Sequence, residues 1–103
     1  MTYHAIQRAF QRYEIALYDH NGVLFERWLR EGDRHVIRLA ELYPGTSLWG
    51  IRTHHQWIAA VLNDLSGDIL TFFPRRRLNP YRKVLRAHRN LHKLKEEERY
   101  YVK

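Results

Sequence analysis

Residues 13–28, YEIALYDHNGVLFERW, decide between two fold classes. An Asn-Gly pair between apolar residues is a strong short-range signal for a β-hairpin. With residues 19–22 as the loop, Tyr18 would face Val23 across the two strands, and further apolar pairs would align outward from them. This pairing predicts a β-hairpin over residues 13–28 and therefore an α+β protein.

The same region also fits an amphipathic helix. Apolar residues recur at helical spacing from Tyr3 to Leu17, and Thr2 can cap the first turn. Few residues here are β-branched, whereas Ala, Leu, Glu, Gln and Arg, which favour helices, are frequent. If this tendency prevails, the protein is an all-α helical bundle. We take the hairpin as the main prediction and the bundle as its alternative.

Two helices are expected in the middle of the chain. Asp33 can cap a helix over residues 33–43, which would end at the Tyr-Pro-Gly sequence that follows. Thr53 can cap a central core helix over residues 54–66, with Gly67 in position to end it. The apolar stripe that predicts this core helix consists of Trp57, Ile58, Val61, Leu62 and Leu65.

The remaining elements are shorter or lie at the C-terminus. Residues 47–52 are expected to form a strand, and residues 68–78 a strand or extended connector broken at Pro74. Asn79 followed by Pro80 is typical of a helix start, because Asn caps well and the first helical position needs no N–H donor. We therefore predict a basic C-terminal helix over residues 80–99.

Composition limits the class of protein. The chain has 103 residues, 45% of them hydrophobic, which suits one folded domain. It has no cysteine, so disulfides and thiolate metal sites are excluded. There is neither a secretory h-region nor an apolar run long enough for a membrane helix, so we expect a soluble, cytoplasmic protein without a membrane partner.

Charge is distributed unevenly. Residues 1–74 hold seven Lys/Arg and eight Asp/Glu, whereas residues 75–103 hold eleven Lys/Arg and three Glu. The entire positive excess of +7 therefore comes from the C-terminal part. We expect a near-neutral globular body over residues 1–74 and a basic segment and helix of the same domain over residues 75–103. Such asymmetry is typical of proteins that contact nucleic acids or other polyanions.

The predicted C-terminal helix carries one cationic stripe. It consists of Arg82, Arg86, Arg89 and Lys93, which are spaced i, i+4, i+7 and i+11 over roughly 16 Å of helix. That length matches several consecutive backbone phosphates, and Arg can contact phosphate with two hydrogen bonds. The candidate phosphate-binding residues are Arg75, Arg76, Arg77, Arg82, Arg86, Arg89 and Lys93. Trp49 and Tyr81 are candidates for stacking on bases, whereas Trp28 and Trp57 lie on apolar stripes and are assigned to the core.

We therefore predict a non-enzymatic protein that binds nucleic acid, DNA or RNA, or acts within a ribonucleoprotein. The alternative is a small inhibitor or accessory subunit that binds an acidic groove of a larger, nucleic-acid-handling protein. A phosphate backbone and an acidic protein groove select the same arginines, so both hypotheses remain open. A homodimer is compatible with the apolar residues at 46–50, TSLWG.

Catalytic and metal sites are not expected. His88 and His92 are spaced i, i+4, as in some metal sites, but no third ligand is evident. His54 and His55 suggest a His-dependent nuclease only as a weak alternative, because no carboxylate partner is identifiable. No glycine-rich phosphate loop is present. We expect no catalytic residue, no cofactor and no metal.

Overall fold

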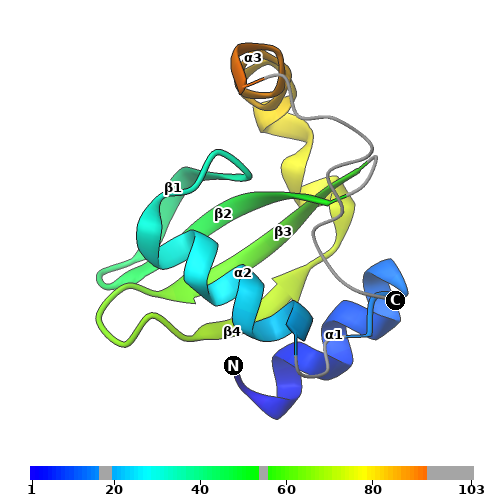
Figure 1. The fold of residues 1–103 in the computed structure, drawn as a ribbon, viewed down its shortest axis with the longest axis vertical. Helices are drawn as coiled ribbons and strands as arrows, with labels where there is room; N and C mark the ends of the chain where they lie inside the picture. Colours follow the sequence, from blue (N-terminus) through cyan, green and yellow to red (C-terminus); the bar gives the residue numbers. More distant parts are fainter. Residues whose placement is uncertain (17–19, 54–55, 93–103) are drawn as a thin grey trace.

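The computed structural model describes residues 1–16, 20–53 and 56–92. In these ranges the chain forms three α-helices, one 3-10 helix and a four-stranded antiparallel sheet (Figure 1). The fold is α+β, as predicted, and the all-α alternative is wrong. No helix within the described ranges is long and apolar enough to cross a membrane. The elements are α1 (Tyr3–Tyr13), α2 (His20–Glu31), β1 (Val36–Tyr43), β2 (Thr46–Thr53), β3 (Gln56–Asn63), β4 (Ile69–Phe73), η1 (Arg75–Tyr81) and α3 (Arg82–His92).

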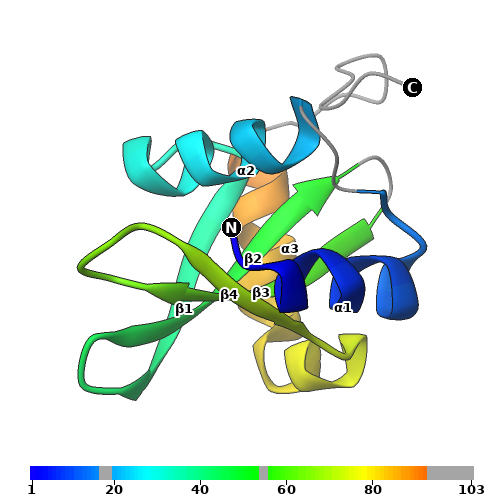
Figure 2. The ribbon, with the colours of Figure 1, turned by 90° about the horizontal axis from the view of Figure 1, so that it is seen from below.

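The strands lie in the sheet in chain order, and each is antiparallel to its neighbour. Helices α1 and α2 pack on one face, and η1 and α3 pack on the other (Figures 1 and 2). Two apolar clusters result, one on each side of the sheet. Phe25 and Phe72 are fully buried in the first cluster, whereas Leu78 and Leu85 attach η1 and α3 to the second.

The predicted hairpin over residues 13–28 is wrong. Tyr13 ends α1, and residues 20–31 form α2, so helix propensity prevails over the Asn-Gly signal. Glu14 closes α1 in the left-handed conformation, with φ 55°. Gly22 is buried in the first turn of α2, where a Cβ would lie 3.4 Å from the Met1 side chain. The glycine thus lies in a helix packed against the N-terminus and does not form a turn.

The predicted helix over residues 33–43 is also wrong, because residues 36–43 form β1. Two register irregularities interrupt its pairing with β2, one between Arg38 and Ala40 and one between Glu41 and Tyr43. A β-bulge adds a residue to one strand and breaks the alternation of faces. Apolar residues then recur at spacings of three and four, which resemble a helical stripe.

The predicted central helix over residues 54–66 is wrong for a different reason. Residues 56–63 form β3, an inner strand of the sheet. Its side chains alternate between the two apolar clusters, with Ile58 and Leu62 in the first and Val61 in the second. A strand covered on both faces has a continuous apolar sequence, which periodicity cannot distinguish from a buried helix. Leu65 lies in the following turn and is 97% exposed.

Three expectations for other elements agree with the structure at least in part. Residues 47–52 lie within β2, and β4 ends at Phe73, directly before Pro74. The C-terminal helix is present, but it begins at Arg82 because residues 75–81, including Pro80, form the 3-10 helix. Residues 93–99 of the predicted helix lie outside the described ranges.

Helix α1 covers the outer edge of β4 (Figures 1 and 2). The Thr2 hydroxyl donates a hydrogen bond to the Leu70 carbonyl at 2.9 Å, and the Arg12 guanidinium donates one to the Phe72 carbonyl at 3.1 Å. The Tyr13 hydroxyl donates to the Phe73 carbonyl at 2.6 Å. An exposed sheet edge offers unpaired carbonyls to other strands. The contacts of Thr2 and Arg12 occupy carbonyls of β4 that would otherwise be open to another strand, whereas the Tyr13 hydroxyl also accepts from Ala59 of β3.

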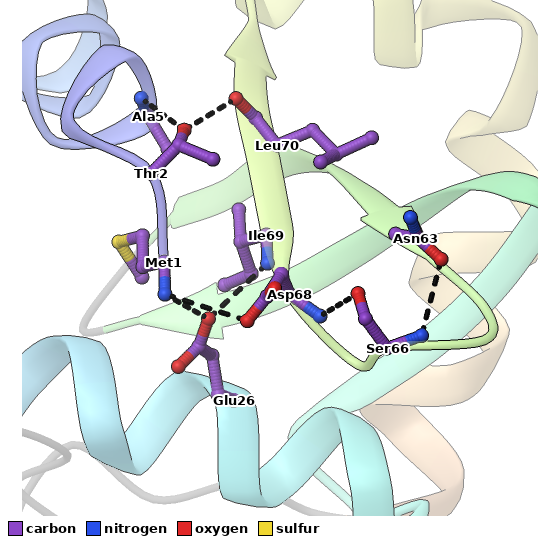
Figure 3. A network of polar contacts seen from close by, with 9 residues as sticks. All are labelled: Met1, Thr2, Ala5, Glu26, Asn63, Ser66, Asp68, Ile69 and Leu70. Carbon is purple, nitrogen blue, oxygen red and sulfur yellow. Dashed lines mark hydrogen bonds and ion pairs between the residues drawn. The ribbon is translucent and has the colours of Figure 1, made fainter.

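The N-terminus joins α1, α2 and the β3–β4 turn (Figure 3). The Met1 amine lies 2.8 Å from a Glu26 carboxylate oxygen and 3.7 Å from an Asp68 oxygen. Its hydrogen bond with Glu26 raises the pKa of the amine, although burial opposes this shift. Glu26 also accepts a hydrogen bond from the Ile69 N–H at 3.2 Å. One carboxylate therefore links α2 to both the chain start and β4.

Tyr13→Phe is expected to lower the free energy of unfolding by about 1–3 kcal/mol. The Tyr13 hydroxyl also accepts a hydrogen bond from the Ala59 N–H at 3.0 Å, so its removal leaves a buried donor and a carbonyl unpaired. Tyr3→Phe is the matched control, because the Tyr3 side chain is 74% exposed. Urea denaturation measures both changes. Equal stability of the two variants would contradict the prediction.

Candidate anion-binding site

Residues 75–92 form a strongly cationic surface on the α3 side of the sheet. This stretch contains seven Lys/Arg and no Asp or Glu. All seven side chains are exposed, and none forms an ion pair within the described ranges. The members of this surface, which we call the basic face, are Arg75, Arg76, Arg77, Arg82, Lys83, Arg86 and Arg89.

The sheet supports the basic face through a small number of close contacts. Leu85 is the buried residue of α3, at 4% exposure, and Leu78 has the same role in η1. A Cβ added to Gly50 of β2 would lie 2.9 Å from Leu85 Cδ2 and 3.2 Å from Trp57 Cε3. A larger residue at position 50 would therefore require the Leu85 and Trp57 side chains to shift. His88 adds a polar contact, with its Nε2 2.8 Å from the Arg34 carbonyl oxygen.

A pocket of about 380 Å³ opens between the basic face and the end of the β2–β3 hairpin. A second hollow of about 290 Å³ shares four of its lining residues, Trp57, Arg82, Leu85 and Arg89. We call the larger hollow the arginine pocket. It is lined by Arg52, Gln56, Trp57, Arg75, Leu78, Asn79, Arg82, Leu85 and Arg89. Four of these nine residues are arginines and none is acidic, so the pocket favours an anion.

Trp57 is the important residue that the sequence interpretation missed. The sequence predicts a core position, and Trp57 does pack against the second apolar cluster, but it is only half-buried and also lies in the wall of the arginine pocket. Its ring centroid lies 6.0 Å from the Arg52 guanidinium carbon and 5.8 Å from the His88 ring, which it meets edge-on. Arg52 is also its direct cross-strand partner in the sheet. No local sequence pattern reveals this site, because Trp57 lies in an uninterrupted apolar run.

The two predicted stacking residues lie elsewhere. Trp49 packs against the first apolar cluster, on the sheet face opposite the arginine pocket. Its indole N–H donates to the Ser47 hydroxyl at 2.8 Å, and that hydroxyl donates to Asp64 at 2.5 Å. Tyr81 packs at the edge of the second cluster and does not line the pocket.

The predicted arginines divide into two groups. Arg75, Arg82 and Arg89 line the arginine pocket, and Arg86 lines the adjoining hollow. Arg75 donates a hydrogen bond to the Gln56 side-chain oxygen. The other two lie outside the pocket. The Arg77 guanidinium carbon lies 4.1 Å from the centroid of the Phe73 ring, and Arg76 is exposed. Lys93 lies outside the described ranges.

The chemistry of this region is suited to binding. Guanidinium groups hold phosphate or carboxylate oxygens through paired hydrogen bonds and remain charged at any relevant pH.

His88 and His92 have ring centroids 4.3 Å apart. No group of three or more potential metal ligands occurs among the described residues, and His54 and His55, the basis of the nuclease alternative, lie outside them.

Comparison with known proteins adds no relative. No protein-family model, curated protein or solved structure matches this chain. The basic face and the arginine pocket are therefore the features of this protein that bear on its function.

Proposed function

We propose that this protein is a non-enzymatic nucleic-acid-binding protein that holds the phosphate backbone on its basic face. The observation that carries the proposal is seven exposed cations within 18 residues without a carboxylate or an ion pair among the described residues. Folding alone gains little from such a surface, because like charges repel one another. A polyanion relieves this repulsion and releases its own condensed counterions.

The arrangement of the arginines supports a phosphate backbone as the ligand. Arg82, Arg86 and Arg89 lie along one side of α3 and span roughly 10 Å of helix axis. Arg75–Arg77 extend the positive charge onto η1. Phosphates repeat along a nucleic acid strand at a similar scale, so several can be contacted at once. Such contacts set position and affinity but do not read sequence.

An acidic groove of a larger protein is the second candidate partner, and it would use the same arginines. The choice of a nucleic acid rests on the aromatic and amide groups that Trp57, Gln56 and Asn79 add beside the arginines. An aromatic ring beside cations is the usual composition of a surface that binds nucleotides. It offers less to a groove whose recognition depends on carboxylates alone.

Salt dependence of binding tests the proposal. Fluorescence anisotropy with labelled single-stranded and duplex DNA and RNA should show affinity that falls steeply with salt. Each neutralised phosphate contributes about −0.9 to the log–log slope on duplex DNA and about −0.7 on single strands, so four to seven contacts predict a slope of roughly −3 to −6. The double variant Arg86→Ala/Arg89→Ala should flatten this slope by about two units while sequence preference stays the same.

The matched control is Arg27→Ala/Arg30→Ala. It removes the same charge from exposed positions on α2, on the other side of the sheet. We expect this variant to keep the slope of the unmutated protein. A protein with no measurable affinity for any of the four nucleic acids at low salt would contradict the proposal, and the acidic protein groove would then be the better explanation.

A further inference from the structure

The arginine pocket contains more than phosphate binding requires. Phosphate needs cations and N–H donors, which Arg75, Arg82 and Arg89 supply. The pocket also has an aromatic and aliphatic wall and two side-chain amides. These additional groups are Trp57, Leu78, Leu85, Gln56 and Asn79. An inorganic anion gains nothing from apolar carbon, so this wall indicates a ligand that also carries an apolar, flat group.

We propose that the arginine pocket binds one unpaired nucleotide of a single strand, with its base against Trp57 and its phosphate among the arginines. This inference rests on the proposed function and specifies which form of nucleic acid is bound. Base–aromatic stacking tolerates any sequence, because every base has a π-face. The Asn79 amide offers a donor and an acceptor to the edge of a base, and the Gln56 amide, whose oxygen accepts from Arg75, offers N–H donors.

The size and position of the pocket agree with this ligand. About 380 Å³ lies at the lower end of the range for small-molecule sites, which suits one nucleotide and not several. Trp57 packs against the second apolar cluster and meets the His88 ring edge-on, so its ring is positioned before a ligand arrives. A base in a duplex is already stacked and paired, so only an unpaired base can enter the pocket.

Abasic strands separate stacking from phosphate binding in the unmutated protein. A labelled oligothymidylate and an abasic strand of equal length carry the same phosphates but differ in their bases. We expect the base-bearing strand to bind about 5- to 150-fold more tightly at one fixed salt concentration, the range for one stacked base. An oligouridylate tests whether an RNA strand behaves in the same way as DNA.

Variants at Trp57 locate the effect. Trp57→Ala should reduce affinity for the oligothymidylate to nearly that for the abasic strand, and leave both the salt slope and abasic binding unchanged. Trp57→Phe retains a ring and should recover most of the affinity. If Trp57→Ala does not fold, the comparison between strands with the unmutated protein still decides the question.

The possible failures are distinguishable. Equal affinity for the base-bearing and abasic strands, with a steep salt slope, overturns this inference and leaves the proposed function standing. A preference for bases that survives in a folded Trp57→Ala variant overturns the assignment to the arginine pocket. No binding to either strand at low salt overturns both proposals.

Discussion

Leu62→Ala is expected to lower the free energy of unfolding by about 2–5 kcal/mol, the range for a buried Leu truncation. Leu62 is 6% exposed and belongs to the first apolar cluster, between β3 and the helices α1 and α2. Its truncation removes apolar contacts and leaves a cavity that the close-packed sheet cannot fill. Urea denaturation followed by circular dichroism measures the loss.

Leu65→Ala is the matched control, and it also distinguishes the observed strand from the helix predicted by the sequence. In a helix Leu62 and Leu65 would lie on one face and both truncations would be costly. In the structure Leu65 is 97% exposed in the turn after β3, so its truncation should change stability by less than about 0.5 kcal/mol. Similar losses for the two variants would contradict the β3 assignment.

Leu85→Asp is expected to detach α3 from the sheet. The side chain is 4% exposed and lies against Gly50, so the variant loses apolar burial and places a carboxylate in an apolar site. Together these effects should destabilise the folded state with α3 docked by about 4 kcal/mol or more. The helix can avoid this loss by detaching from the sheet. Hydrogen exchange should show lost protection of the α3 amides, and nucleic-acid binding should weaken because the arginine pocket loses one wall.

Leu91→Asp provides the control for charge. Leu91 lies on the same helix and is 77% exposed, so this variant introduces the same negative charge near the basic face without disturbing the core. It should retain stability and α3 protection, and weaken binding only by the electrostatic contribution of one charge. The prediction would be contradicted if both variants kept hydrogen-exchange protection of the α3 amides and weakened binding equally. The Leu85 contact would then not be required to hold α3 at the arginine pocket.

Local sequence signals identified some features of this protein correctly. The Thr2 cap, which supported the helical alternative and not the main prediction, begins α1, since its side chain accepts a hydrogen bond from the Ala5 N–H at 3.0 Å. The strand at residues 47–52 and a helix containing Arg82, Arg86 and Arg89 are also present. These features depend on caps, propensity and helical spacing, which act over a few residues. Composition likewise identified the basic C-terminal part, because charge counts do not depend on the fold.

Tertiary structure decided the identity of the middle elements. Both segments predicted as helices are strands, β1 and β3, and the α+β class was correct although the predicted hairpin was not. In β1 the bulges disturb the alternation of apolar and polar residues that marks a strand. In β3 this alternation is absent, because both faces of the strand are covered by apolar clusters. An apolar run becomes an inner strand because neighbouring strands complete its hydrogen bonds and helices cover both of its faces. The neighbouring strands β2 and β4 adjoin β3 in the chain, whereas the helices that cover its faces are distant in sequence.

The sequence by itself predicted an arginine-rich C-terminal segment, and which of its arginines share one side of a helix. Only the tertiary structure decided that Trp57 stands beside them. The position of Trp57 beside the arginines depends on the close approach of Leu85 to Gly50 and on the cross-strand pairing of Arg52 with Trp57. Helical periodicity relates residues three and four apart, whereas the arginine pocket joins β2, β3, η1 and α3. The basic face is thus a local property of the sequence, and the pocket is a product of long-range packing.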